Sequence, residues 1–183
     1  QQIASPTEAL AAYRRALTMQ EHLLAQTPDD LRTLESLGDT WNAIGSVLFK
    51  QRRLDQAQAA HRSARRLRER FAERTSRESE SWRALANSLM NLGLVHREKG
   101  EFQQAGQLYR QAQELRIKAL ALESTSIKVR RDLGIGHYNL AVLHLPADNL
   151  DLVQADAELE QAIARFDEVL QKEPQDLQNR HRL

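Results

Sequence analysis

The chain has 183 residues, of which 41% are hydrophobic and 28% are charged, a composition typical of a folded domain rather than a disordered one. Lys and Arg total 26 and Asp and Glu total 25, so the formal net charge of +1 gives no overall attraction to nucleic acid or to an anionic membrane. Cysteine is absent, which excludes disulfides and thiolate metal sites, and no apolar stretch approaches the length needed to cross a bilayer. We expect a cytoplasmic protein with no cofactor, because the sequence also lacks a secretory signal pattern and a phosphate-binding loop.

Apolar residues keep helical spacing along almost the whole chain, and they are interrupted by only seven glycines and four prolines. The spacing predicts about seven helices, at 6–26, 29–50, 54–75, 78–99, 101–123, 126–145 and 150–172. The first helix opens with the capping box Ser5-Pro6-Thr7-Glu8, which places proline at the first helical position. Gly100 and residues 51–53 predict turns inside helix pairs, whereas Pro28 and Pro174 predict turns between pairs.

The helices repeat at a regular interval, which indicates an array of similar helix pairs. A small–bulky–small pattern recurs in alternate helices, and its evenly spaced copies at Ala9, Ala57 and Ala105 define a 48-residue period. A second pattern with the same period marks the intervening helices at Trp41, Leu89 and His137. A fourth copy of the first pattern begins at Ala155, two positions later than the period predicts, which indicates a longer turn around Pro146.

The repeat boundaries divide one solenoid into units. Residues 1–28 supply the second helix of a preceding repeat, full repeats occupy 29–76, 77–124 and 125–174, and residues 175–183 begin a further repeat. The chain starts with Gln1 rather than Met. We therefore expect a segment excised from a longer array.

The repeated residues resemble the tetratricopeptide repeat. The unit that matches best carries the family's pattern at Leu89, Leu92, Gly93, His96, Gly100, Phe102, Ala105, Tyr109 and Ala112. Arg52 replaces the turn glycine in the preceding unit. The period is longer than the family's ordinary one of about 34 residues, which adds two turns to each helix. The resemblance implies an all-α, right-handed superhelical solenoid of antiparallel helix pairs.

Small residues in the pattern predict the places where neighbouring helices approach closely. We expect Ala57 and Ala105 at these contacts, and greater tolerance of substitution at Gln58 and Ala60. His61 and His96 occupy positions where the family often has an aromatic residue, so we expect partly buried packing histidines that loosen on ionisation. No two histidines lie four residues apart on a helix, which argues against a metal site.

No motif predicts catalysis, so we do not expect an enzyme. The segment 134–136 lacks a third glycine for a phosphate loop, and Arg130-Arg131-Asp132-Leu133 lacks the histidine and the asparagine of a kinase catalytic loop. The arginine-rich stretch 62–70 contains acidic residues and no aromatic stacking platform, which predicts a solvated helix face rather than a nucleic-acid site.

The resemblance implies a concave groove, lined by first helices, that binds a peptide or partner protein. The groove candidates are residues that face the groove in the resembled family, their neighbours in the chain, and residues one helical turn before them. They are Asn42, Arg83, Asn87, Met90, Asn91, Arg131, Tyr138 and Asn139. Arg83 and Arg131 are one period apart, which predicts a partly cationic strip for an acidic peptide. In the alternative, the arginines only pair with acids such as Glu80 or Asp132, and the asparagines satisfy local backbone groups.

The predicted function is a non-catalytic protein-interaction module. The alternative is a structural spacer that self-associates end to end through stacked helices. The repeats also resemble arrays attached to bacterial serine/threonine protein kinases, through short sequence motifs at 13–17, 90–93 and 130–133. The resemblance implies that the host protein is such a kinase.

Overall fold

A computed structural model describes residues 5–145 and 150–172 and contains seven helices in that part of the chain. They are α1 (Pro6–Gln26), α2 (Leu31–Lys50), α3 (Leu54–Arg74), α4 (Ser79–Glu98), α5 (Phe102–Leu122), α6 (Ile127–Leu143) and α7 (Leu152–Lys172). Each helix begins and ends within two residues of its predicted bounds. The predicted turns at Pro146 and Pro174 and the predicted new repeat at 175–183 lie outside the described residues.

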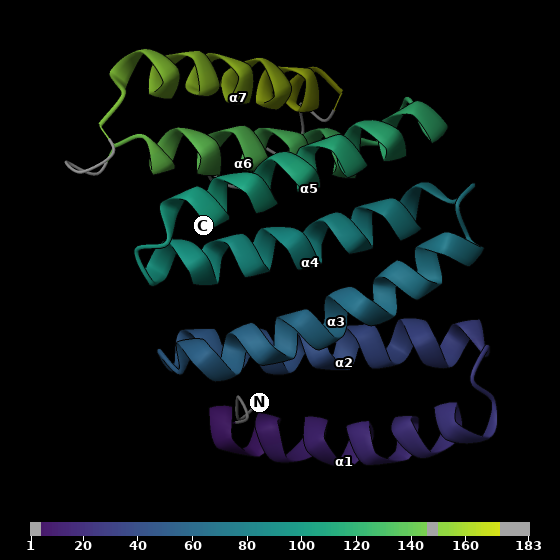
Figure 1. The fold of residues 1–183 in the computed structure, drawn as a ribbon. Coiled ribbons are helices and arrows are strands. Elements are labelled where there is room, and N and C mark those ends of the chain that lie inside the picture. Colours follow the sequence, from purple (N-terminus) through teal and green to yellow (C-terminus); the bar gives the residue numbers. More distant parts are fainter. Residues whose placement is uncertain (1–4, 146–149, 173–183) are drawn as a thin grey trace, which may run out of the picture.

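The helices stack in chain order, with α1 and α7 at opposite ends of the stack (Figure 1). The antiparallel pairs α2–α3, α4–α5 and α6–α7 pack most extensively, and α1 packs on α2. The first helices α2, α4 and α6 also touch one another in sequence, which places them on a common side. The predicted all-α solenoid of antiparallel helix pairs is therefore confirmed.

Side-chain caps fix where the first two helices start. The Ser5 hydroxyl accepts a hydrogen bond from the Glu8 N–H at 3.2 Å, and the Glu8 carboxylate accepts one from the Ser5 N–H at 2.7 Å, so the predicted capping box is formed. Asp30 caps α2 by accepting the Thr33 N–H at 2.8 Å. This cap explains why α2 begins two residues later than predicted.

The turns within the pairs α2–α3 and α4–α5 both need a left-handed backbone. Gly100 adopts φ +78°, which glycine tolerates because it has no Cβ. Arg52 adopts φ 61° at the matching position, at an intrinsic cost of about 1–2 kcal/mol for a residue with a side chain. The Arg52 guanidinium pairs with Glu98 of α4, so the residue that replaces glycine links one repeat to the next.

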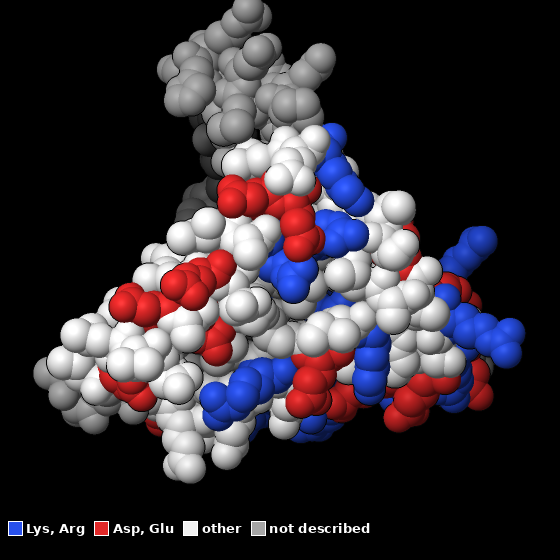
Figure 2. Space-filling view, turned by 90° about the horizontal axis from the view of Figure 1, so that it is seen from above, with Lys and Arg blue, Asp and Glu red and all other residues white. Residues whose placement is uncertain are grey.

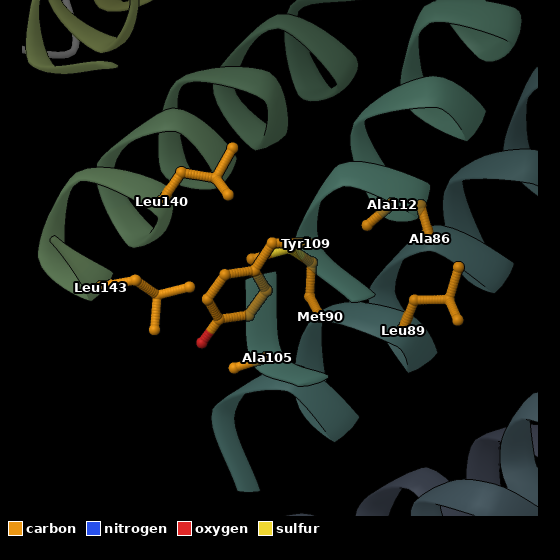
Figure 3. Close-up of a cluster of buried hydrophobic side chains, with 8 residues drawn as sticks. All are labelled: Ala86, Leu89, Met90, Ala105, Tyr109, Ala112, Leu140 and Leu143. Carbon is orange, nitrogen blue, oxygen red and sulfur yellow. The ribbon is translucent and has the colours of Figure 1, made fainter. Parts of the chain in front are cut away.

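Two large rings pack directly on glycine backbone inside the helix pairs. A Cβ at Gly93 would lie 2.3 Å from Cε1 of Tyr109, and a Cβ at Gly45 would lie 2.6 Å from Cε1 of His61. Tyr109 has no exposed surface, and it lies among the buried side chains of α4, α5 and α6 (Figure 3). The glycines are therefore required by the close approach of the two helices in each pair.

The small residues of α3 are more extensively buried than the sequence predicted. Ala57 and Ala105 have no exposed surface, as expected for helix contacts. The predicted tolerance at Gln58 and Ala60 is wrong, because both side chains are buried as well. Ala60 belongs to the core that joins α1, α2 and α4, and the Gln58 amide bonds to His96 at 3.0 Å. Contact with α4 as well as α2 widens the buried face of this helix.

His61 is a buried packing histidine, as predicted. It is 2% exposed, and its Nδ1 has no hydrogen-bond partner among residues 5–145 and 150–172. Burial lowers the pKa of His61 from 6.5 to about 4, and the nearby charge of Arg68 lowers the pKa further in the same direction. His61 is therefore neutral in the folded chain at neutral pH.

Overpacking at the helix contact gives a direct test of the buried face. Ala57→Leu should lower the free energy of unfolding by about 1–3 kcal/mol, because the added methyl groups have no space between α3 and its neighbours. The control is Ala59→Leu, the same change at an exposed position on the same helix. Urea denaturation measures both variants, and equal stabilities would contradict the assignment of faces.

His61 should make stability fall on acidification. Between pH 6.5 and about 4 the unfolded chain binds a proton that folded His61 does not, so up to about 3 kcal/mol is lost as the pH falls through this window. Below that pH the folded form also takes up the proton, and the loss stops growing.

His61→Phe, which resembles Tyr109 at the equivalent position, should flatten this part of the profile. Carboxylates with a lowered pKa, such as Glu98 and Glu101, titrate alike in both proteins and cancel in the difference. Urea denaturation between pH 7 and pH 4 measures the effect, and parallel profiles would show that His61 does not cause it.

Candidate peptide-binding groove

Two of the predicted groove asparagines bond to each other across the first junction between first helices. The Asn91 side chain on α4 donates from Nδ2 to Oδ1 of Asn42 on α2, at 2.7 Å. Both residues are half-buried. This amide bridge holds α2 against α4 and occupies groups that the prediction assigned to a ligand.

The equivalent positions on α4 and α6 behave differently because one partner is apolar. Met90 stands one period after Asn42 and is 5% exposed, packed in the core with Tyr109 and Leu140. Without an amide opposite, Asn139 turns back and donates to the Ile135 carbonyl of its own helix at 3.0 Å. Met90 and Asn139 are therefore structural here, as the local alternative predicted for Asn139, and neither presents a side chain to the groove.

Arg83 is engaged in ion pairs on the groove side of α4. Its Nε donates to Glu80 at 2.9 Å and its Nη1 donates to Asp132 of α6 at 3.0 Å. The hydrogen bond to Glu80 is the main cause that raises the pKa of Arg83, followed by the bond to Asp132. For Arg83 the structure agrees with the alternative prediction, in which the arginine pairs with these acids. Arg131, its counterpart on α6, is half-buried.

A buried arginine on each of two second helices reaches between neighbouring first helices, a feature that the sequence prediction missed. Arg68 of α3 donates to Asp39 on α2 at 2.6 Å, and to the Ala84 carbonyl and the Ser88 hydroxyl on α4, both at 2.9 Å. It therefore joins two repeats through an ion pair and two charge-assisted hydrogen bonds to neutral acceptors. The recurrence of arginine one period later, at Arg116, was the available signal.

Arg116 lies at the same place one repeat later but has a poorer set of partners. Asn87 replaces the aspartate and accepts from Arg116 at 3.3 Å, and Gln113 accepts at 3.3 Å. Its Nε is buried and has no hydrogen-bond partner among the described residues. Burial lowers the pKa of Arg116 to about 10, which Asp132 partly opposes through its negative charge. A Cβ at Gly136 would lie 2.7 Å from Nη1, so this glycine makes room for the guanidinium.

A cleft of about 220 Å³ opens between α2 and α4 on the groove side. Asn87, one of the predicted groove residues, lies in its wall beside Arg83. The full lining is Glu35, Asp39, Arg68, Phe71, Glu78, Glu80, Ser81, Arg83, Ala84 and Asn87. The sequence predicted Glu80 only as a possible partner of an arginine, and it did not predict that Glu78 and Glu80 would line a cleft together with residues of α2.

The groove side of α6 is more apolar than that of α2 and α4. Ile135 is 41% exposed and Tyr138 is 50% exposed. Ile135 stands where Asp39 and Asn87 stand in the two earlier repeats. The predicted groove thus changes from polar at α2 to partly apolar at α6, and Tyr138 is the groove candidate most accessible to a ligand.

Charge and composition limit the chemistry of the described surface. The face in Figure 2 carries basic and acidic side chains interspersed with uncharged ones. Within residues 5–145 and 150–172, no group of three or more His, Asp or Glu side chains gathers to hold a metal ion. None of the helices described is long and apolar enough to cross a membrane.

Comparison with known families identifies the central repeats. Residues 36–118, from within α2 to within α5, match the family model described as tetratricopeptide repeat. This segment is therefore similar to tetratricopeptide repeats. No curated protein matches the chain.

Several solved structures are similar to the chain. MamA is 14% identical, with 92% of this chain and 98% of MamA covered and a TM-score of 0.45. A thermophilic tetratricopeptide protein of Thermus thermophilus is 22% identical, with 95% and 90% covered and a TM-score of 0.35. BtubC from P. vanneervenii is 13% identical, with 90% and 92% covered and a TM-score of 0.31.

The ion pair between Arg83 and Asp132 should contribute to the contact between α4 and α6. Their side chains are 20% and 17% exposed, so solvent screens the pair less than a surface pair. A double-mutant cycle with Arg83→Met and Asp132→Asn should give a coupling of about 1 kcal/mol in the free energy of unfolding. A coupling of zero in urea denaturation would mean that the pair has no energetic role.

Proposed function

We propose that this chain is a protein-interaction module that binds an extended segment of a partner protein along the groove side of α2, α4 and α6. Tetratricopeptide repeats are generally protein-interaction modules and are typically non-catalytic. The observation that carries the proposal is the cleft between α2 and α4, because it lies on the side where the first helices come together.

Two further features support an extended ligand. Exposed Ile135 and Tyr138 on α6 offer apolar contact beyond the cleft. Polar side chains such as Asn87 border the same surface, and an amide can bond the backbone of a peptide and fix its register. An acidic residue in the ligand remains our prediction for the part of the groove near Arg131.

Self-association is the second candidate function. Three apolar side chains of α7, the last helix described, are largely exposed: Leu152 at 59%, Val153 at 76% and Ile163 at 59%. Apolar surface at the end of a stack favours contact with another helix. Analytical ultracentrifugation over a range of concentrations would test it. Attachment to a serine/threonine kinase remains a prediction that the sequence of the parent protein would test.

A matched pair of exposed isoleucines tests the groove. Peptides that bind the wild-type chain are selected from a random library, and their affinities are then measured for Ile135→Ser and Ile117→Ser. Ile135→Ser should weaken binding about 5- to 30-fold, because about 1–2 kcal/mol of apolar contact is lost. Ile117→Ser, which changes a 60% exposed residue of the second helix α5, should leave binding unchanged. Equal effects of both variants, or no binding peptides at all, would contradict the groove proposal.

A further inference from the structure

The cleft between α2 and α4 has an excess of negative charge. Four carboxylates line it, from Glu35, Asp39, Glu78 and Glu80, and only two guanidinium groups do so. Opposite charges in a part-enclosed cleft attract more strongly than on an open surface, because less water screens them. The lining therefore carries two uncompensated negative charges before any ligand enters.

Both cations of the cleft are already engaged. Arg68 is buried and pairs with Asp39 at 2.6 Å. Arg83 pairs with Glu80 at 2.9 Å and shares its charge with Asp132 outside the cleft at 3.0 Å. Neither guanidinium neutralises the remaining carboxylates.

Glu35 and Glu78 are the carboxylates left over. Both residues are exposed, and neither side chain has a hydrogen bond or ion pair within the described parts of the chain. One comes from α2 and the other from the residue that precedes α4, so they approach the cleft from two repeats. Because both line the same cleft, a cation that enters it meets carboxylates from two repeats.

The wall of the cleft also provides apolar surface. Phe71 and Ala84 contribute to the lining, and Phe71 is 9% exposed. A long basic side chain can lay its methylene groups on such a surface while its charged end reaches the carboxylates. The volume of about 220 Å³ suits one such side chain rather than a helix.

The next junction shows that this acidity is not a general property of the repeat. The four carboxylate positions, moved by one period to the junction of α4 with α6, are occupied by Arg83, Asn87, Ser126 and Lys128. Every acid is replaced by a neutral or basic residue. The acidic cleft is thus confined to one junction of the array, where it marks a definite position along the groove.

We propose that the cleft between α2 and α4 binds a lysine or arginine side chain of the partner's extended segment, held between Glu35 and Glu78. This inference rests on the proposed groove function and adds a specific position to it. The basic residue of the ligand lies toward the N-terminal repeat, and the rest of the segment runs across α4 to Ile135 and Tyr138 on α6. The acidic junction therefore fixes the position of the basic residue along the groove.

The test measures whether the ligand's basic residue and the two glutamates depend on each other in binding. Peptides selected on the wild-type chain should share one lysine or arginine position. Glu35→Gln/Glu78→Gln should weaken their binding about 3- to 10-fold, as expected for a partly exposed ion pair. Replacing the peptide lysine with norleucine should weaken wild-type binding by the same factor and have no further effect on the variant. The melting temperature should not fall, because neither glutamate has an ion-pair partner in the described parts of the chain.

The matched control is Glu114→Gln/Glu160→Gln, which removes the same charge from exposed positions on the second helices α5 and α7. It should leave peptide affinity unchanged. Peptides that depend on Ile135 but show no basic preference, or no coupling to the glutamates, would overturn the cleft inference and leave the groove function in place. The absence of any selected peptide would overturn both.

Discussion

The contact between a large ring on a second helix and a glycine on a first helix sets the geometry on which the array depends. Tyr109 covers Gly93 and His61 covers Gly45, with separations that no residue with a Cβ would allow. This contact brings the two helices of a pair close together and fills the space between them with a single side chain. The buried alanines then continue the contact on either side, and the next pair stacks on the surface that results.

The repeats share this geometry, but the junctions between them differ in their polar residues. Within the part of the chain that the structure describes, Arg68 finds a carboxylate, a hydroxyl and a carbonyl, whereas Arg116 finds two side-chain amides. Asn91 bonds across to Asn42, whereas Asn139 bonds to its own helix because Met90 stands opposite. A buried cation without a carboxylate costs stability, so the junction at Arg116 is less well satisfied than the junction at Arg68.

Much of the fold could be predicted from the sequence, because the signals for it are local or periodic. Helical spacing and the capping box at Ser5 indicated the helices, and the regular recurrence of the small residues indicated their pairing. The site was harder to predict, since it depends on which side chains meet across helices. Whether Arg83 faces a ligand or Asp132 is decided by a contact with the next repeat, and the burial of Met90 depends on Leu140 of that same repeat. The acidic cleft needed both α2 and the start of α4 in place.

The sequential stacking of the helices has a consequence for the growth of such arrays. Each helix rests mainly on its neighbours in the chain, and α1 and α7 lie at opposite ends of the stack. Insertion or loss of a helix pair therefore changes the contacts at one place between neighbouring pairs and leaves the other contacts unchanged. Genes for such chains can lengthen or shorten by whole units without redesign of a central core. The acidic junction of α2 with α4 and the junction of α4 with α6 can consequently be inherited, duplicated or moved as separate modules.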